Sequence, residues 1–480
     1  MAGTIGRSGY ISVSQTYLPA DVPTPMTRSR PNNWSSSARI GLMGATVYGL
    51  ALFGLLPALA CATETPFAGR WSGRAHTADE TTRIELDVVC EERRCRARMN
   101  LLDVGVRGWP AEYVEARADR FAVVVRADSG PQTLSLRYED ERMSGEWRAP
   151  GYDEVATVSL DRIQALEDVP EERVAIVGPA GSLGASVILP EGDGPFPGVV
   201  FLHGSGPQLR DANRWAAQEL SRYGIASVVY DKRGVGESEG DFVGASLEDL
   251  ARDGIAVAEY LLKTAAVSAV GFAGHSQGGW IGPLAGCLWP ATAFVISSAG
   301  PAVPPSRETH WPVIRAMRAN GASPADEAVA RHLFDLWHEG IRSGDWYPFD
   351  QAFANAQREP WFDSSGIAWL EGRPDGDALR TYRAMMDYDP IPVLRSLEVP
   401  LLALLSPDDE SIDAVETEGI LRALAGTGRN IEIRTYPGYS HGMRRLGARW
   451  PSLPDDYYRH QADFIKRSVG TSERSDFQRD

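Results

Sequence analysis

Residues 274–278 of the chain read Gly-His-Ser-Gln-Gly, with Ser276 at the centre of a Gly-x-Ser-x-Gly pattern. An apolar strand-like run ends just before this pattern, and a helix-like stretch follows it. This context predicts a tight strand-to-helix turn that presents a serine hydroxyl as a nucleophile. The following helix, beginning at Gln277, would point its N-terminal amides at the site, where negative charge develops during acyl transfer.

A second Gly-x-Ser-x-Gly pattern surrounds Ser440 at residues 438–442. The Met-Arg-Arg-Leu-Gly segment after it leads into a Pro-rich stretch and not into a helix. Because the pattern carries meaning only between a strand and a helix, Ser440 is interpreted as a loop residue. Ser276 is the candidate nucleophile.

Acyl transfer also needs two N–H donors for the oxyanion. One belongs to the residue after the nucleophile, Gln277, and the other to a loop after an earlier strand. The buried-type run 199–202 ends in His-Gly-Ser-Gly-Pro at 203–207, so Ser205 is the predicted second donor. The alternative is an ordinary strand–loop turn.

A carboxylate is expected after the apolar run 399–405, which ends in Ser-Pro-Asp-Asp-Glu. We favour Asp409 over Asp408, because it lies one residue further beyond the Ser-Pro turn. The choice between the two stays open at this point, as does a solvated acidic turn without a catalytic role.

The candidate base is His441, which follows an alternating strand-like segment at 431–436 and a Gly/Pro loop. Ser276, Asp409 and His441 occur in the order Ser, Asp, His. In such a triad the histidine accepts the serine proton and later returns it to the leaving group, while the carboxylate orients the imidazole.

With these residues identified, the chain resembles α/β-hydrolase-fold serine esterases, and more narrowly bacterial esterases with a small all-β domain in front. The resemblance rests on the motifs at 203–207 and 274–278, on Tyr-Asp-Lys-Arg-Gly-Val-Gly-Glu-Ser at 230–238, and on Ser-His-Gly at 440–442. It covers about residues 175–470, with weaker similarity over 65–165, and it implies ester hydrolysis by the triad. The basic residues of 230–238 are interpreted as structural and not catalytic.

Composition limits the partners. The chain has 480 residues and a formal net charge of −16, which argues against nucleic acid. No spacing of metal ligands is found, and no metal or cofactor is expected. The expected partner is a small-molecule ester, as the triad and the resemblance imply.

The segment 1–62 is interpreted as a signal or anchor. Arginines precede an apolar stretch at 40–60, which ends in Ala-Leu-Ala before Cys61. Three alternatives remain: cleavage after Ala60 or Ala62, lipid attachment at Cys61, or an uncleaved membrane anchor. Each of them predicts export to the periplasm or the extracellular space.

Three further cysteines fit such a compartment. Cys90 and Cys95 lie between two strand-like runs, where a disulfide is predicted. Cys287 is expected to be a buried, small apolar residue.

Two domains are expected after the leader. Residues 63–165 read as short strands of an all-β domain. Trp71 and Trp147 are expected to pack in its core or at its rim, and a ligand platform is the alternative. Residues 173–470 alternate strands and helices, which predicts a mostly parallel sheet covered on both faces.

Helix-like residues 301–396 interrupt this second domain and are expected to form a lid over the site. Trp311 and Trp337 are the predicted pocket residues. The histidines at 310, 332 and 338 are interpreted as solvated helix residues and not as metal ligands. A peptidase, an acyl-CoA thioesterase, or a binding protein without activity on the same fold are the alternatives to an esterase.

Overall fold

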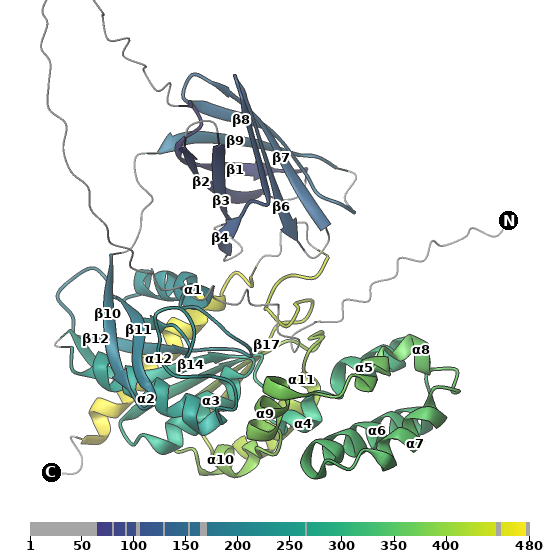
Figure 1. Cartoon of the computed structure of the whole chain (residues 1–480). Helices are drawn as coiled ribbons and strands as arrows, with labels where there is room; N and C mark the ends of the chain where they lie inside the picture. The colour runs from purple at the N-terminus through teal and green to yellow at the C-terminus, as the bar shows by residue number, and fades with distance from the viewer. Residues whose placement is uncertain are drawn as a thin grey trace, which may run out of the picture.

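The computed structural model describes residues 65–476 apart from 79–80, 92–93, 102–105, 128–129, 152–153, 164–169, 265 and 448–452. The segment predicted at 1–62, including Cys61, lies outside these residues. Among the residues described, no helix is both long and apolar enough to cross a lipid bilayer. The described chain forms two folded parts, each built around its own β-sheet (Figure 1).

The first part is a nine-stranded antiparallel sheet in the order β4-β3-β2-β1-β9-β8-β7-β6-β5. Its strands are β1 (Gly69–His76), β2 (Thr81–Glu91), β3 (Arg94–Leu101), β4 (Val106–Pro110), β5 (Tyr113–Arg117), β6 (Arg120–Ala127), β7 (Gly130–Glu139), β8 (Arg142–Arg148) and β9 (Ala156–Ile163).

The two ends of this sheet meet between β4 and β5. The N–H of Ala111 donates to the carbonyl of Ala97 on β3, and that of Glu112 donates to Val124 on β6. Trp71 and Trp147 fill the interior with exposed fractions of 0% and 1%, so the prediction of core tryptophans is correct. Cys90 and Cys95 face each other across β2 and β3 and form the predicted disulfide.

The second part is an eight-stranded sheet in the order β10-β11-β13-β12-β14-β15-β16-β17. The pairs β10–β11 and β11–β13 are antiparallel, and all pairs from β13 onward are parallel. Its strands are β10 (Glu171–Gly178), β11 (Gly181–Ile188), β12 (Phe196–Leu202), β13 (Ala226–Tyr230), β14 (Val267–His275), β15 (Thr292–Ser298), β16 (Leu401–Leu405) and β17 (Ile431–Thr435).

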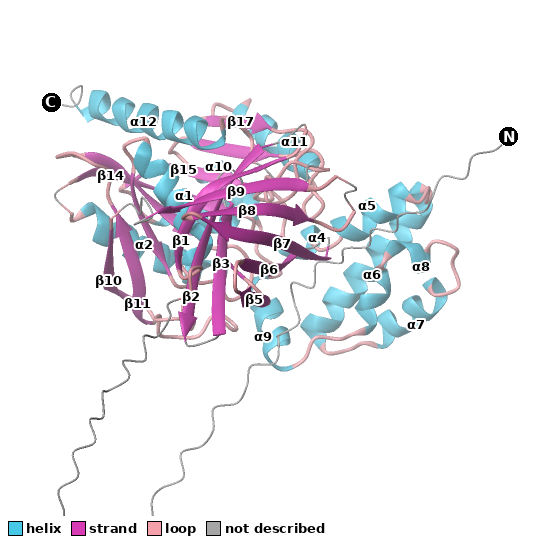
Figure 2. Cartoon of the chain, turned by 90° about the horizontal axis from the view of Figure 1, so that it is seen from above, coloured by secondary structure: helices cyan, strands magenta, loops and turns pink. Residues whose placement is uncertain are grey.

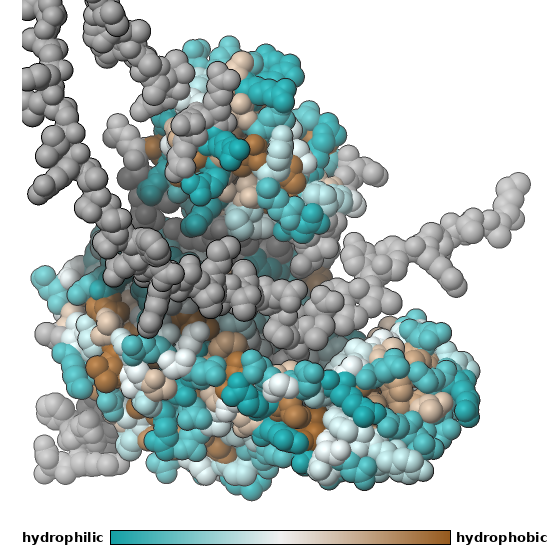
Figure 3. Space-filling model, in the orientation of Figure 1, coloured by the Kyte–Doolittle hydropathy of each residue, from teal (hydrophilic) through white to brown (hydrophobic). Residues whose placement is uncertain are grey.

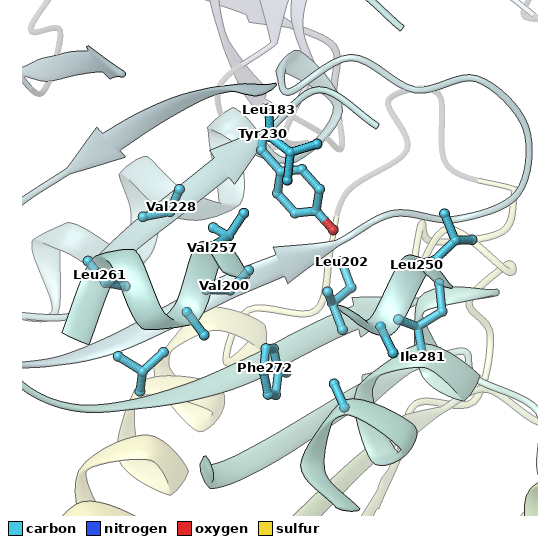
Figure 4. Packing of buried hydrophobic residues seen from close by; sticks show 14 of the residues in the cluster. Leu183, Val200, Leu202, Val228, Tyr230, Leu250, Val257, Leu261, Phe272 and Ile281 are labelled. Atoms are coloured by element: carbon cyan, nitrogen blue, oxygen red, sulfur yellow. The ribbon is translucent and has the colours of Figure 1, made fainter. Parts of the chain in front are cut away.

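Helices cover both faces of this sheet, because its central strands are apolar on both sides (Figure 2). One face packs on α2 (Leu247–Leu262), α3 (Gly278–Leu288) and α11 (Ala414–Ala425), and the other on α1 (Asp211–Arg222) and α12 (Tyr457–Asp476). Figure 4 shows Leu202, Tyr230 and Phe272 in one cluster with Leu250 and Val257 of α2 and Ile281 of α3. This arrangement confirms the predicted fold class.

One prediction at the rim of this core is wrong. Cys287 is exposed, and its thiol donates to the carbonyl of Val393. In the same turn of α3, Gly286 faces Val295 of the sheet, so the cysteine lies on another side of the helix.

The insertion between β15 and β16 is helical. It contains α4 (Pro305–Glu308), α5 (Trp311–Ala319), α6 (Pro324–Ser343), α7 (Tyr347–Ala356), α8 (Phe362–Ser365), the 3-10 helix η2 (Ile367–Glu371), α9 (Gly376–Met385) and α10 (Pro390–Ser396). Ser323 caps α6 in a reciprocal capping box with Asp326. Figure 3 shows that the displayed surface is mainly hydrophilic, with small scattered apolar patches.

The insertion has its own apolar core, which explains a second wrong prediction. His310 and His338 are not solvated: they are 6% and 2% exposed and stack against Phe334. Desolvation lowers the pKa of His310 to about 3 and that of His338 to about 4, so both imidazoles are neutral.

Candidate active site

Ser276 lies in a strained turn between β14 and α3. Its φ is 55°, in the left-handed region that side chains rarely adopt, and its N–H donates to the carbonyl of Ser298 at 3.0 Å. The flanking glycines permit the turn: a Cβ on Gly274 would lie 2.1 Å from the carbonyl oxygen of Gly278. A Cβ on Gly278 would lie 2.9 Å from that of Leu202. The local geometry is therefore that of the predicted strand-to-helix turn.

Ser440 has no such geometry. It lies in the loop after β17, where its N–H donates to the carbonyl of Arg444 and no helix follows directly.

His441 and Asp409 lie together at the carboxyl ends of β17 and β16. Nδ1 of His441 is 2.9 Å from Oδ2 and 3.1 Å from Oδ1 of Asp409. Asp409 is only 1% exposed. Its Oδ1 also accepts the N–H groups of Ser411 and Ile412 at 2.7 and 3.0 Å. A carboxylate held in this way can orient an imidazole without itself moving.

The neighbouring acids support the loops instead. Asp408 accepts the N–H of Gly438 at 2.6 Å, and Glu410 accepts the backbone N–H of His441 at 2.9 Å. The geometry thus separates Asp408 from Asp409, which the sequence left open.

His441 lies beside the serine turn. Its ring centroid is 5.0 Å from that of His275, the residue before Ser276. No hydrogen bond joins the side chains of His441 and Ser276, both of which are described; such bonds often tighten only when substrate binds. Burial lowers the pKa of His441, but its bond to Asp409 and the charges of Asp409, Glu308 and Glu410 together raise that pKa above the ordinary value.

The loop at 203–207 packs against the same turn. The position of a Cβ on Gly204 is 3.6 Å from the carbonyl oxygen of His275. The side chain of Gln208 holds the loop, accepting from the N–H of Gly204 and donating to the carbonyl of Ser205. Gln277 is the N-cap of α3 and is 3% exposed. The two predicted oxyanion residues, Ser205 and Gln277, therefore belong to segments that contact each other.

The basic motif at 230–238 lies behind this loop. Arg210 binds Asp231 through its Nε and Nη2, and Arg233 binds Asp253 in the same way. Both ion pairs are buried and agree with the structural interpretation. Lys232 differs, because its Nζ donates to the carbonyls of the loop and to the side chain of Gln277.

A pocket, which we call the lid pocket, lies next to Gln277 and His441. It is lined by Pro305, Ser306, Glu308, Thr309, His338, Thr381, Tyr382, Met385 and Met386. Met385 connects it to the oxyanion residues, because its Sδ accepts from Nε2 of Gln277 at 3.4 Å. Glu308 connects it to His441 through their charges.

Sequence reasoning missed Glu308 and Lys232. Desolvation raises the pKa of the Glu308 carboxyl to about 7, and the nearby charge of His441 opposes that rise. No motif marks Glu308, which stands in a four-residue helix far from the triad in sequence. For Lys232 the signal was present in the motif at 230–238, but its contacts were not predictable.

The two predicted pocket tryptophans lie in different places. The indole N–H of Trp311 donates to the carbonyl of Asp409 at 3.0 Å, so Trp311 contacts the acid loop. Trp337 is 1% exposed and packs inside the insertion against Trp346, Trp369 and Tyr382. Neither tryptophan lines the lid pocket.

Within the described residues, no group of three His, Cys, Asp or Glu side chains is placed to hold a metal ion.

Two family descriptions match the second folded part. Residues 195–337 match the family described as serine aminopeptidase, S33. Residues 351–472 match the prolyl oligopeptidase family.

Two characterised proteins are similar to the chain at low sequence identity. The chain is 23% identical over 298 residues to esterase EstD of Thermotoga maritima, covering 61% of this chain and 64% of that protein's length. It is 28% identical over 273 residues to a non-heme chloroperoxidase of Burkholderia pyrrocinia, covering 52% and 87%. A solved esterase of Pyrococcus furiosus aligns with a TM-score of 0.41 and 14% identity, covering 64% of this chain and 96% of that one.

Proposed function

Since the chain belongs to the α/β-hydrolase serine esterase family, we propose that it hydrolyses carboxylic esters through an acyl-enzyme on Ser276. The observation that carries the proposal is the strained turn at Ser276 with the His441–Asp409 pair beside it. A serine held at φ 55° is retained at a stability cost, which is typical of a functional position.

The chemistry follows from the contacts of each group. His441 Nδ1 is engaged by Asp409, so Nε2 is free to take the proton of Ser276 Oγ as that oxygen attacks the ester carbonyl. The negative charge moves to the carbonyl oxygen, where the backbone N–H groups of Gln277 and Ser205 receive it. The C–O bond of the alcohol then breaks, and His441 returns the proton to the leaving oxygen.

The second half of the cycle repeats these steps with water. His441 takes a proton from water, the hydroxide attacks the acyl carbon, and Ser276 leaves with the proton from His441. The products are a carboxylic acid and the regenerated enzyme.

The test is labelling and turnover of the whole protein. Ser276→Ala should abolish fluorophosphonate labelling and lower kcat for p-nitrophenyl esters by about 10⁴–10⁶. Ser440→Ala is the matched control, since it removes the serine of the other Gly-x-Ser-x-Gly pattern. This variant should keep fluorophosphonate labelling and a native kcat. Normal turnover in Ser276→Ala would reject the proposal.

A second candidate is the hydrolysis of short peptides with a free amino end. The observation that favours it is Glu308, whose carboxylate lines the lid pocket beside His441 and has no ion-pair partner among the described residues. A substrate ammonium group would complete that pair.

A substrate panel separates the two candidates. It comprises p-nitrophenyl esters, aminoacyl anilides and acyl-CoA thioesters. An esterase should prefer neutral esters over anilides by kcat/KM, whereas a peptidase should cleave anilides of free amino acids and lose that activity in Glu308→Gln.

A further inference from the structure

Lys232 is a buried cation that directly contacts the oxyanion segments. It is 3% exposed, and its Nζ donates to the carbonyl of Gly204 at 2.8 Å, the carbonyl of Gly206 at 3.0 Å and Oε1 of Gln277 at 3.0 Å. An ammonium group has three N–H donors, so these contacts use all of them.

The three acceptors have one feature in common: they flank the expected oxyanion donors. Gly204 and Gly206 are the residues on either side of Ser205, and Gln277 follows the nucleophile. A single ammonium therefore joins the loop after β12 to the N-cap residue of α3. These are the two segments whose separation sets the geometry of the hole.

The two neighbouring cations do not share this role. Arg210 and Arg233 each face a buried aspartate, Asp231 and Asp253 respectively. No carboxylate of the described chain forms an ion pair with Lys232, whose positive charge meets only carbonyl and amide oxygens. Burial without a counter-ion lowers the pKa of Lys232 to about 7. The charge also acts on its surroundings, because after desolvation it is the next cause that lowers the pKa of His203 to about 3.

We propose that Lys232 is a positioning residue of the oxyanion hole. It fixes the loop at 204–206 to Gln277, and its positive charge stabilises the negative charge that develops on the oxyanion. This inference rests on the proposed ester hydrolysis at Ser276. A buried cation without a counter-ion is unfavourable in the free enzyme, and it becomes favourable when a negative charge forms nearby. The gain is therefore largest in the transition state, and it should appear in kcat and not in KM.

The test compares two variants of the whole protein. Lys232→Met removes the ammonium and its three contacts while keeping an unbranched side chain. Arg233→Met removes the neighbouring buried cation, which contacts no part of the oxyanion loop, and so serves as the control for lost stability. Each variant is measured for unfolding midpoint, for kcat and KM on p-nitrophenyl butyrate, and for Ki with an alkyl boronic acid that forms a tetrahedral adduct.

Lys232→Met is expected to lower kcat by about 10²-fold, the effect of losing one oxyanion-hole donor, with KM changed less than about threefold. The Ki of the boronic acid should rise in proportion to the loss of kcat/KM. Arg233→Met should show a lower unfolding midpoint with kcat and Ki near those of the native protein.

Three results would overturn the inference: kcat close to native in Lys232→Met, an unchanged boronate Ki, or the same loss of kcat in both variants. The inference and the proposed function fail in different ways. If Ser276→Ala is inactive while Lys232→Met is fully active, only the role of Lys232 is rejected. If Ser276→Ala remains active, the assignment of the site itself is rejected.

Discussion

Nδ1 of His441 lies within hydrogen-bond distance of both carboxylate oxygens of Asp409, at 2.9 and 3.1 Å. The adjacent Asp408 accepts the backbone N–H of Gly438 and forms no hydrogen bond with the imidazole ring. Two consecutive aspartates thus have separate tasks: one faces the candidate base, and the other holds the loop that carries it.

This separation predicts unequal effects of the same substitution. Asp409→Asn should lower kcat by about 10⁴, because the amide favours the wrong imidazole tautomer. Asp408→Asn keeps an acceptor for the N–H of Gly438 and should lower kcat by less than about tenfold. Steady-state turnover of a p-nitrophenyl ester measures both. Equal losses, or a larger loss in Asp408→Asn, would mean that the acid is assigned to the wrong residue.

The strained backbone at Ser276 predicts that replacing this residue with glycine stabilises the protein. Glycine tolerates φ 55° without the steric cost that a Cβ brings, so Ser276→Gly should raise the free energy of unfolding by about 1 kcal/mol. Ser276→Ala retains the Cβ and is the matched control, with little change expected. Urea unfolding of the two inactive variants gives the comparison. A Ser276→Gly variant that is less stable than Ser276→Ala would show that the turn is not strained.

Glu308 predicts a shift in the pH dependence of activity. Its negative charge is one of the causes that raise the pKa of His441. The base works in its neutral form, so kcat/KM rises as pH increases through that pKa. Glu308→Gln removes the charge, lowers the pKa of His441 and should move the acidic limb of the profile to lower pH.

The measurement is kcat/KM against pH with a neutral ester, so that charge on the substrate does not interfere. Glu416→Gln is the control, because Glu416 pairs with Arg307 at the surface close by and should leave the limb in place. An acidic limb that stays in place or moves to higher pH in Glu308→Gln would contradict the electrostatic coupling.

The sequence predicted features that are local. The Ser276 turn depends on glycines within two residues of it, and the disulfide depends on two cysteines at opposing positions of a hairpin. Features that join distant segments were not predictable. Lys232 contacts Gln277 across 45 positions, and Glu308 approaches His441 across an even longer separation. His310 and His338 were predicted as solvated because their helix periodicity does not reveal which face the insertion buries.

The Cys90–Cys95 disulfide predicts a modest stabilisation of the β domain. The closed loop is short, so the bridge restricts the unfolded chain little, and its loss in a Cys90→Ser/Cys95→Ser variant should cost about 2 kcal/mol or less. Thiol counting under denaturing conditions should find no reactive thiol at either position in protein from an oxidising compartment. Two additional thiols in that assay would show that the bridge does not form there.

The last prediction concerns which residues of the insertion set the acyl specificity. Met385 lines the lid pocket and contacts the side chain of Gln277. Trp337 lies one layer behind the lining, in the interior of the insertion, where it packs against Tyr382 without lining the pocket itself. Met385→Ala enlarges the pocket next to the oxyanion residues and should raise kcat/KM for long-chain esters relative to short-chain esters.

Trp337→Leu is the control, since it leaves a void in the apolar core of the insertion and should lower the free energy of unfolding by about 2–4 kcal/mol. Its ratio of long-chain to short-chain hydrolysis should stay that of the native protein. The result that contradicts this is the reverse pattern, a changed ratio in Trp337→Leu and none in Met385→Ala. The acyl group would then enter the core of the insertion, and the lid pocket beside Glu308 would not be its binding site.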